Sequence, residues 1–187
     1  MTRTAFDHLL TEARHAHDHH PDLRAFCGFP DDLRATPATP FHVPAAEIMA
    51  GDHALSATGL TTFRDAFIAA GPDATWRETY KGSGLPDDFM DRFGCYCLVG
   101  KGGNWISTQM ACYLVYMTAG LYYHWHQQPD EELYLVGAGE ARCYRDGMGA
   151  ETLGPGQTAF HKSDQPHAMQ TLDKPVMAYV VWRNNLG

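Results

Sequence analysis

The stretch that decides the fold runs from Gly120 to Gly139 and reads GLYYHWHQQPDEELYLVGAG. Side chains alternate between the two faces of a β-strand, so an extended segment over residues 122–128 places every second side chain on one face. These side chains are Tyr122, His124, His126 and Gln128. After a turn at Pro129-Asp130, Glu132 and Tyr134 share the corresponding face of a second strand. Two antiparallel strands therefore present imidazole, amide, carboxylate and phenol groups to one cavity.

This set of nitrogen and oxygen donors is typical of a metal site. It suits a divalent transition metal such as Zn, Fe, Mn, Ni or Co, and the sequence does not select among them. A core that merely needed filling would not place so many polar groups on one face, because buried polar groups cost free energy unless they have partners.

The pattern around this stretch predicts a mainly β fold. From about Phe93 onward, short apolar segments alternate with glycine turns, which favours a small β-barrel. The predicted strands are Gly94–Val99, Ile106–Met117, Tyr122–Gln128, Glu132–Val136, Ala141–Arg145, Gln157–His161, His167–Thr171 and Val176–Trp182. Helical spacing predicts helices over Thr4–His17, Thr61–Ala70 and Pro86–Phe93, and the segment 22–44 is predicted as loop. We therefore expect a helical extension over residues 1–92, packed on a barrel over residues 93–187.

Composition excludes several classes of function. The chain has 187 residues, which suits one domain with an extension. Its 14 Lys and Arg against 22 Asp and Glu give a formal charge of −8, so neither nucleic acid nor an anionic membrane is an expected partner. No apolar stretch approaches the roughly 20 residues that span a membrane, and residues 1–20 lack the apolar core of a secretory signal. Together with five unpatterned cysteines, this predicts a cytoplasmic protein.

The decisive stretch resembles the first motif of the cupin superfamily. Gly120, five residues, His126-x-Gln128, three residues, Glu132, six residues and Gly139 match its spacing without a gap. Gln128 stands where a second histidine is usual. In a rival register His124 and His126 form the histidine pair, but five residues then precede Glu132 and the glycine spacing is lost. His124 therefore stays open as the alternative to Gln128.

The second cupin motif implies the remaining ligand. Gly156, five residues, Lys162-x-Asp164, two residues and His167 keep its glycine and histidine spacing, although its usual Pro-x-Gly is absent. The resemblance thus implies metal ligands at His126, Gln128, Glu132 and His167. His161, just before this motif, is interpreted as a loop histidine.

Further features resemble the cupin-type dimethylsulfoniopropionate lyases and their lyase-like relatives. They are Tyr123, His126-x-Gln128, Glu132-x-Tyr134, His167-Ala-Met-x-Thr171 and Trp182. This resemblance implies a metal-dependent carbon–sulfur lyase with Tyr134 as the base and Tyr123 positioning or relaying the proton. On strict alternation Tyr123 points away from His126, so a β-bulge is needed to bring both to one face.

Two other readings stay open at this point. One is a different metal-dependent cupin enzyme, an isomerase or a dioxygenase, acting on a small carboxylate or a sugar-like substrate. The other is a cupin that binds a small ligand with a weakened metal site, because the amide oxygen of Gln128 is a poorer ligand than imidazole. Cupin folds are commonly dimers, and a homodimer is compatible with the sequence without being demonstrated by it.

Overall fold

Two antiparallel sheets face one another in this protein, described here by a computed structural model for residues 3–80 and 82–183. The larger sheet has the order β1 (Arg34–Ala35), β3 (Trp105–Ile106), β2 (Phe93–Val99), β4 (Ala111–Met117), β11 (Val176–Arg183), β6 (Glu131–Gly139) and β9 (Thr158–His161). The smaller sheet has the order β5 (Tyr122–His126), β10 (His167–Gln170), β7 (Ala141–Arg145) and β8 (Glu151–Leu153). Among the described residues, every pairing of these strands is antiparallel except that of β2 with β3.

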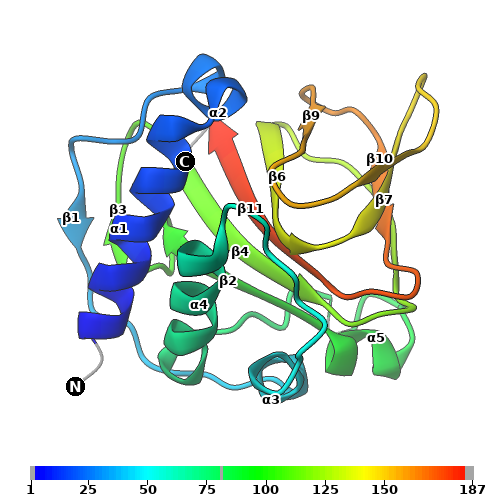
Figure 1. Ribbon diagram of the computed structural model, residues 1–187, viewed down its shortest axis with the longest axis horizontal. Helices are drawn as coiled ribbons and strands as arrows, with labels where there is room; N and C mark the ends of the chain where they lie inside the picture. The colour runs from blue at the N-terminus through cyan, green and yellow to red at the C-terminus, as the bar shows by residue number, and fades with distance from the viewer. Residues whose placement is uncertain (1–2, 81, 184–187) are drawn as a thin grey trace.

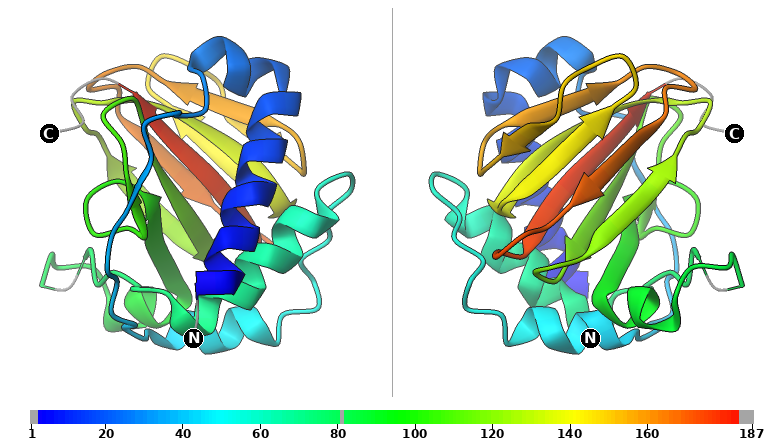
Figure 2. Two further views of the ribbon diagram at one scale, coloured as in Figure 1. Left: turned by 90° about the vertical axis from the view of Figure 1, so that its left-hand side faces the viewer. Right: turned by 90° about the vertical axis from the view of Figure 1, so that its right-hand side faces the viewer.

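Helices cover the outer face of the larger sheet. They are α1 (Arg3–His19), α2 (Pro21–Phe26), α3 (Pro44–Ala50), α4 (Thr61–Ala70) and the 3₁₀ turn η1 (Gly71–Asp73). The short helix α5 (Asp87–Arg92) instead packs Phe89 into the core between the two sheets. Figure 1 shows α1 and α4 side by side against the large sheet, and the left view of Figure 2 shows α1 running across its strands. Phe6 and Phe67 from these helices pack on Tyr96 of β2 in the first of two buried cores.

The second buried core lies between the two sheets. Along β2, β4 and β11 alternate side chains turn inward, among them Cys95, Val115 and Val180, and meet Tyr123 and Cys143 from the smaller sheet. The right view of Figure 2 shows the smaller sheet covering this side of the larger one. The larger sheet is thus buried on both faces, which explains the nearly continuous apolar runs of β2, β4 and β11.

The predicted fold class, a mainly β cupin preceded by helices, is confirmed. Two predictions within it are wrong. The segment Ile106–Met117 is not one strand, because the Asp32 carboxylate accepts hydrogen bonds from the Ser107 and Thr108 hydroxyls, at 2.5 and 2.7 Å, and holds a turn there. The segment 22–44 is not entirely loop, because Pro21 and Pro44 each open a helix, a position that suits the fixed φ angle of proline. No helix in the described residues is long and apolar enough to cross a membrane.

The three motif glycines all adopt positive φ angles: 71° at Gly120, 73° at Gly139 and 83° at Gly156. At Gly139 there is also no room for a side chain, since a Cβ atom would lie 1.9 Å from the carbonyl oxygen of Pro175. Glycine is therefore required at the end of β6 for two separate reasons, and the chain can turn into β7 only with it.

Candidate active site

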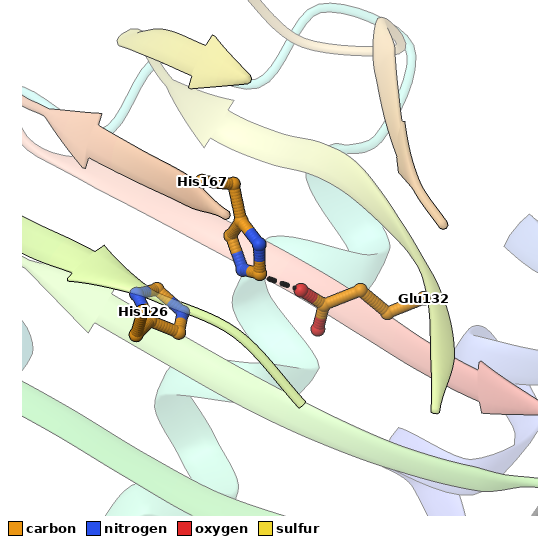
Figure 3. Close-up of side chains that lie close together, drawn as sticks. All are labelled: His126, Glu132 and His167. Carbon is orange, nitrogen blue, oxygen red and sulfur yellow. Dashed lines mark ion pairs between the residues drawn. The ribbon is translucent and has the colours of Figure 1, made fainter. Parts of the chain in front are cut away.

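Three side chains that the sequence predicts as metal ligands meet between the two sheets. His126 comes from β5, His167 from β10 and Glu132 from β6 of the facing sheet. One potential ligand atom from each lies within 4.8 Å of the other two. Figure 3 shows the two imidazoles and the carboxylate turned toward a common space, with His167 Nε2 2.7 Å from Glu132 Oε1.

The polar atoms of this cluster fit a bound cation. His167 Nε2 and Glu132 Oε1 are fully buried, and within the described part of the chain neither has a hydrogen-bond partner, although they are only 2.7 Å apart. Their directions do not suit a hydrogen bond between them. Two ligands that each lie about 2.0–2.1 Å from one metal ion are separated by roughly 2.9–3.4 Å and point at the ion, not at each other. Buried donor atoms with this arrangement are what a divalent metal ion requires.

Contacts behind the ligands fix which atoms face the centre. The Nδ1 atom of His126 lies 2.8 Å from the carbonyl oxygen of His124, and that of His167 lies 2.9 Å from the carbonyl oxygen of Gln165. Since a carbonyl only accepts, each Nδ1 carries a proton, and Nε2 of each ring is the nitrogen left to face the centre. Trp182 donates its indole N–H to Glu132 Oε2 at 2.8 Å. Such outer contacts orient metal ligands, and those made by the histidine N–H groups also raise the basicity of the imidazoles.

His161 is a site residue that the sequence analysis missed. Its interpretation as a loop histidine is wrong, because it lies at the end of β9 with 2% of its surface exposed. Its Nδ1 is 3.1 Å from Glu132 Oε1, and its ring stacks on that of His167 at 4.0 Å between centroids. The sequence signal that could have identified His161 is alternation along the predicted strand, which turns Ala159 and His161 to the same inward face.

The charges in this cluster hold Glu132 ionised and His126 neutral. Burial by itself raises the pKa of the Glu132 carboxyl, but its contacts with His161 and His167 outweigh burial and lower that pKa to about 2. Burial, followed by the neighbouring His167, lowers the pKa of His126 to about 4, and burial also lowers the pKa of His161. An ionised carboxylate and neutral imidazoles are the forms that bind metal ions.

A β-bulge in β5 decides which of its side chains reach the site. Tyr123 and His126 pair with Met169 and His167 of β10, so two residues of β5 stand opposite one residue of β10. The extra residue turns Tyr123 and His126 to the same side, where their rings stack at 4.1 Å between centroids. The expected strict alternation is therefore wrong, and His124 is exposed, with its ring against that of Tyr122.

Gln128 and the two predicted catalytic tyrosines all line one pocket. Gln128 is partly buried, and its Nε2 atom is enclosed without a partner among the described residues. Tyr134 is buried beside His161 and His167, with ring centroids at 4.9 and 6.1 Å. The hydroxyl of Tyr123 hydrogen-bonds that of Tyr80, a partner that the sequence did not indicate. Burial raises the pKa of both Tyr123 and Tyr134 well above the ordinary value.

The pocket has a volume of about 270 Å³. Two charged residues, Glu132 and Arg77, line its wall. Six aromatic side chains form much of the remaining wall: Tyr80, Phe93, Tyr113, Tyr123, Tyr134 and Trp182. The site can therefore hold a small molecule with one end at the His–Glu cluster and the other against aromatic rings.

Comparisons with known proteins agree with the resemblance stated from the sequence. Residues 30–178 match the model of the dimethylsulfoniopropionate lyase family. The chain is 50% identical to the dimethylsulfoniopropionate lyase DddQ of Ruegeria pomeroyi, covering all of this chain and 94% of that one. It is similar to the crystal structure of that DddQ, with a TM-score of 0.96 over 98% of this chain and 93% of the other. It is also similar to a structure described under the DMSP lyases RdDddP and RnDddQII, at 35% identity and a TM-score of 0.95, over 100% and 95% of the two chains.

Proposed function

This chain belongs to the dimethylsulfoniopropionate lyase family, and we propose that it is itself a metal-dependent carbon–sulfur lyase that splits dimethylsulfoniopropionate into dimethyl sulfide and acrylate. The observation that carries the proposal is the cluster of His126, Glu132 and His167, whose ligand atoms lie within 4.8 Å of one another. His126 and Glu132 of this cluster line a pocket that also contains two tyrosines.

The ligands proposed for the metal ion are Nε2 of His126, Oε1 of Glu132 and Nε2 of His167. These atoms come from both sheets, and the contacts of His126 and His167 with backbone carbonyls leave their Nε2 atoms free for the ion. A further position is open to two side chains, Gln128 from the sequence analysis and His161 from the structure. When bound, a divalent cation supplies Lewis acidity, which holds the substrate carboxylate and stabilises enolate-like charge beside it.

We assign the base to Tyr134. In the proposed reaction its phenolate oxygen takes a proton from the carbon next to the substrate carboxylate. The electron pair of that C–H bond forms the new C=C bond, and the C–S bond breaks with its electron pair passing to sulfur. Neutral dimethyl sulfide and acrylate result. Because burial raises the pKa of Tyr134, positive charge near its oxygen is needed to make the phenolate available.

Tyr123 is assigned a positioning role. Its ring stacks on the ligand His126, and its hydroxyl is held by that of Tyr80, so it forms a fixed side of the pocket. The aromatic wall suits the other end of the substrate, since a sulfonium cation over an aromatic face gains about 0.5–2 kcal/mol.

We place this reaction in the cytoplasm. The five cysteines have free thiols, and four of them are buried, an arrangement suited to a reducing compartment. A homodimer stays a prediction, and every group assigned above comes from a single chain.

The experiment measures dimethyl sulfide in the headspace by gas chromatography after the purified protein is given dimethylsulfoniopropionate. Protein stripped with a chelator is compared with the same protein reloaded with Zn²⁺, Mn²⁺, Fe²⁺, Co²⁺ or Ni²⁺. We expect release only from reloaded protein, and its loss in His126→Ala. Folded, reloaded protein that releases no dimethyl sulfide with any of these metals would contradict the proposal.

A further inference from the structure

We propose that His161 is a metal ligand in this chain and fills the position predicted for Gln128. The donor set is then three imidazoles and one carboxylate, from His126, His161, His167 and Glu132. This inference rests on the metal site proposed above and concerns how that site is built.

The position of His161 supports this assignment. Register pairs His161 of β9 directly with Glu132 of β6, so the strands bring the two side chains together. The Nδ1 atom of His161 is 3.1 Å from Glu132 Oε1, the same oxygen that His167 Nε2 approaches to 2.7 Å. Neighbouring ligands of one metal ion are separated by roughly 2.9–3.4 Å, so the 3.1 Å contact of His161 falls within this range and the 2.7 Å contact of His167 lies just below it.

The unpaired state of His161 Nδ1 gives the second argument. This atom is fully buried, and the described residues provide no hydrogen bond for it. A buried polar atom without a partner costs about 1–3 kcal/mol, so an apolar residue would be more stable here if the position served packing alone. The other inward residue of β9, Ala159, is apolar. The His161 ring now stacks on that of His167 at 4.0 Å between centroids, and each imidazole binds a metal ion through a lone pair in its own plane. Binding through Nδ1 therefore requires the His161 ring to turn out of this stack, after which one ion would satisfy this atom together with Nε2 of His167 and Oε1 of Glu132.

Gln128 is the weaker candidate on the same criteria. It is only partly buried, whereas His161 has 2% of its surface exposed. Its donor would be a neutral amide oxygen, which binds borderline metal ions less tightly than imidazole does. A histidine supplied by β9 therefore compensates for the glutamine that stands where the cupin motif usually has its second histidine.

The proposal predicts which ring nitrogen of each histidine binds the metal ion, and this can be measured. His126 and His167 have Nδ1 bonded to carbonyl oxygens and must bind through Nε2, whereas His161 faces the cluster with Nδ1. Long-range ¹H–¹⁵N spectra of the wild-type protein, before and after Zn²⁺ is added, measure this directly. We expect three bound imidazoles, two through Nε2 and one through Nδ1. Only two bound imidazoles, both through Nε2, would overturn the proposal.

Variants test the same assignment by affinity. Co²⁺ binding to His161→Ala and to the matched control Gln128→Ala is followed by visible absorption and by competition with a chelator. Loss of His161 is expected to weaken binding by about 100-fold or more and to reduce the d–d bands, whereas Gln128→Ala stays within a few-fold of wild type. If Gln128→Ala weakened Co²⁺ binding more than His161→Ala did, the ligand position would belong to Gln128 and the proposal would be overturned.

Neither measurement uses the substrate, so the result is independent of the lyase reaction. If His161→Ala does not fold, the spectra of the wild-type protein still decide the number of bound histidines. If the spectra show two histidines while dimethyl sulfide is still released, the function proposed above stands and the role of His161 is overturned.

Discussion

Tyr134 and Tyr123 both line the pocket, but their surroundings give them different roles. Tyr134 lies beside His161 and His167, close to where positive charge from a metal ion is expected. The hydroxyl of Tyr123 already has a partner in Tyr80, so its orientation is fixed by the protein and not by the substrate. The sequence placed both tyrosines at the site by resemblance alone, and only the structure separates their environments.

Replacing Tyr134 with Phe removes the proposed base and leaves the ligands in place. We expect kcat for dimethyl sulfide release to fall by about 100-fold to 10,000-fold, because that is what a positioned general base contributes. Metal content, measured by atomic absorption, should stay at the wild-type level. Tyr80→Phe is the matched control, since it removes a hydroxyl from the same wall without removing the base. A Tyr134→Phe protein with wild-type kcat would move the base to another residue.

Single residues also show why some of the proposed ligands were predictable and one was not. His126, Glu132 and His167 lie within a motif whose spacing determines strand register, and the structure brings them together. His161 lies one residue before the second motif, and no spacing rule separates it from a loop residue. Its place at the site depends on pairing between β9 and β6, whose paired residues are 23 to 29 positions apart in the chain and meet only when the sheet forms.

At the scale of elements, β5 shows where local patterning fails. Strict alternation places Tyr122, His124 and His126 on one face of β5. The bulge opposite Ala168 inserts one extra residue between Tyr123 and His126, so these two side chains share a face instead. The need for a bulge could be inferred from the conflict between Tyr123 and His126. Its position could not, because it depends on which residues of β10 pair with β5. The same limit applies to α3, whose short apolar face is defined only by packing on its neighbours.

The end of β6 provides a stability test at this scale. Gly139→Ala forces a Cβ atom against the Pro175 carbonyl and also strains the positive φ angle. Gly147→Ala is the matched control, since Gly147 has a φ of 76° with no atom within 4 Å of an added Cβ. We expect the control to lose about 1–2 kcal/mol of unfolding free energy from φ strain. Gly139→Ala should lose at least about 2 kcal/mol more, measured by urea denaturation, and equal losses would contradict the steric argument.

The contact of α1 with the large sheet predicts a pH dependence. His17 is fully buried in α1, with Nε2 2.9 Å from the Cys27 carbonyl oxygen, and burial lowers its pKa in the folded state. An unfolded histidine keeps a pKa near 6.5, so below that pH the unfolded state binds more protons and folding loses stability.

We therefore expect the unfolding free energy of metal-free protein to fall as pH drops from 7 to 5. His17→Gln cannot titrate and should show a shallower slope over this range. The other buried histidines, His126 and His161, contribute equally to both proteins, so the difference in slope isolates His17. Parallel slopes, measured by urea denaturation at each pH, would show that His17 does not contribute in this way.

At the scale of the whole molecule, the proposed metal ion joins the two sheets. His126 and His167 belong to the smaller sheet and Glu132 to the larger one, so the ion would act as a crosslink across the inter-sheet core. A mainly β fold preceded by helices was predictable from glycine turns, apolar runs and helical spacing, whereas the face that the helices cover was not. That side chains from β5, β6 and β10 come together was predictable only through the motif, because local composition does not determine distances between side chains on different sheets.

Metal binding to the folded state alone should stabilise the protein. At a free concentration about 100 times the Kd, the gain is about 2.7 kcal/mol, and for a chain of this size it raises Tm by about 5–11 °C. Differential scanning calorimetry of chelated and Zn²⁺-loaded protein measures the shift, and His167→Ala should reduce it strongly. Equal shifts in wild type and His167→Ala would place the bound metal elsewhere.

The most direct test of the account is to follow the products of dimethylsulfoniopropionate by proton NMR, with chelated protein and with the same protein after metal is restored. The account predicts that acrylate and dimethyl sulfide appear together in a one-to-one ratio, at a rate that depends on the restored metal. Consumption of the substrate with any other carbon product, or an equal rate from chelated protein that is shown to be metal-free, would contradict the elimination at the His126, Glu132 and His167 centre.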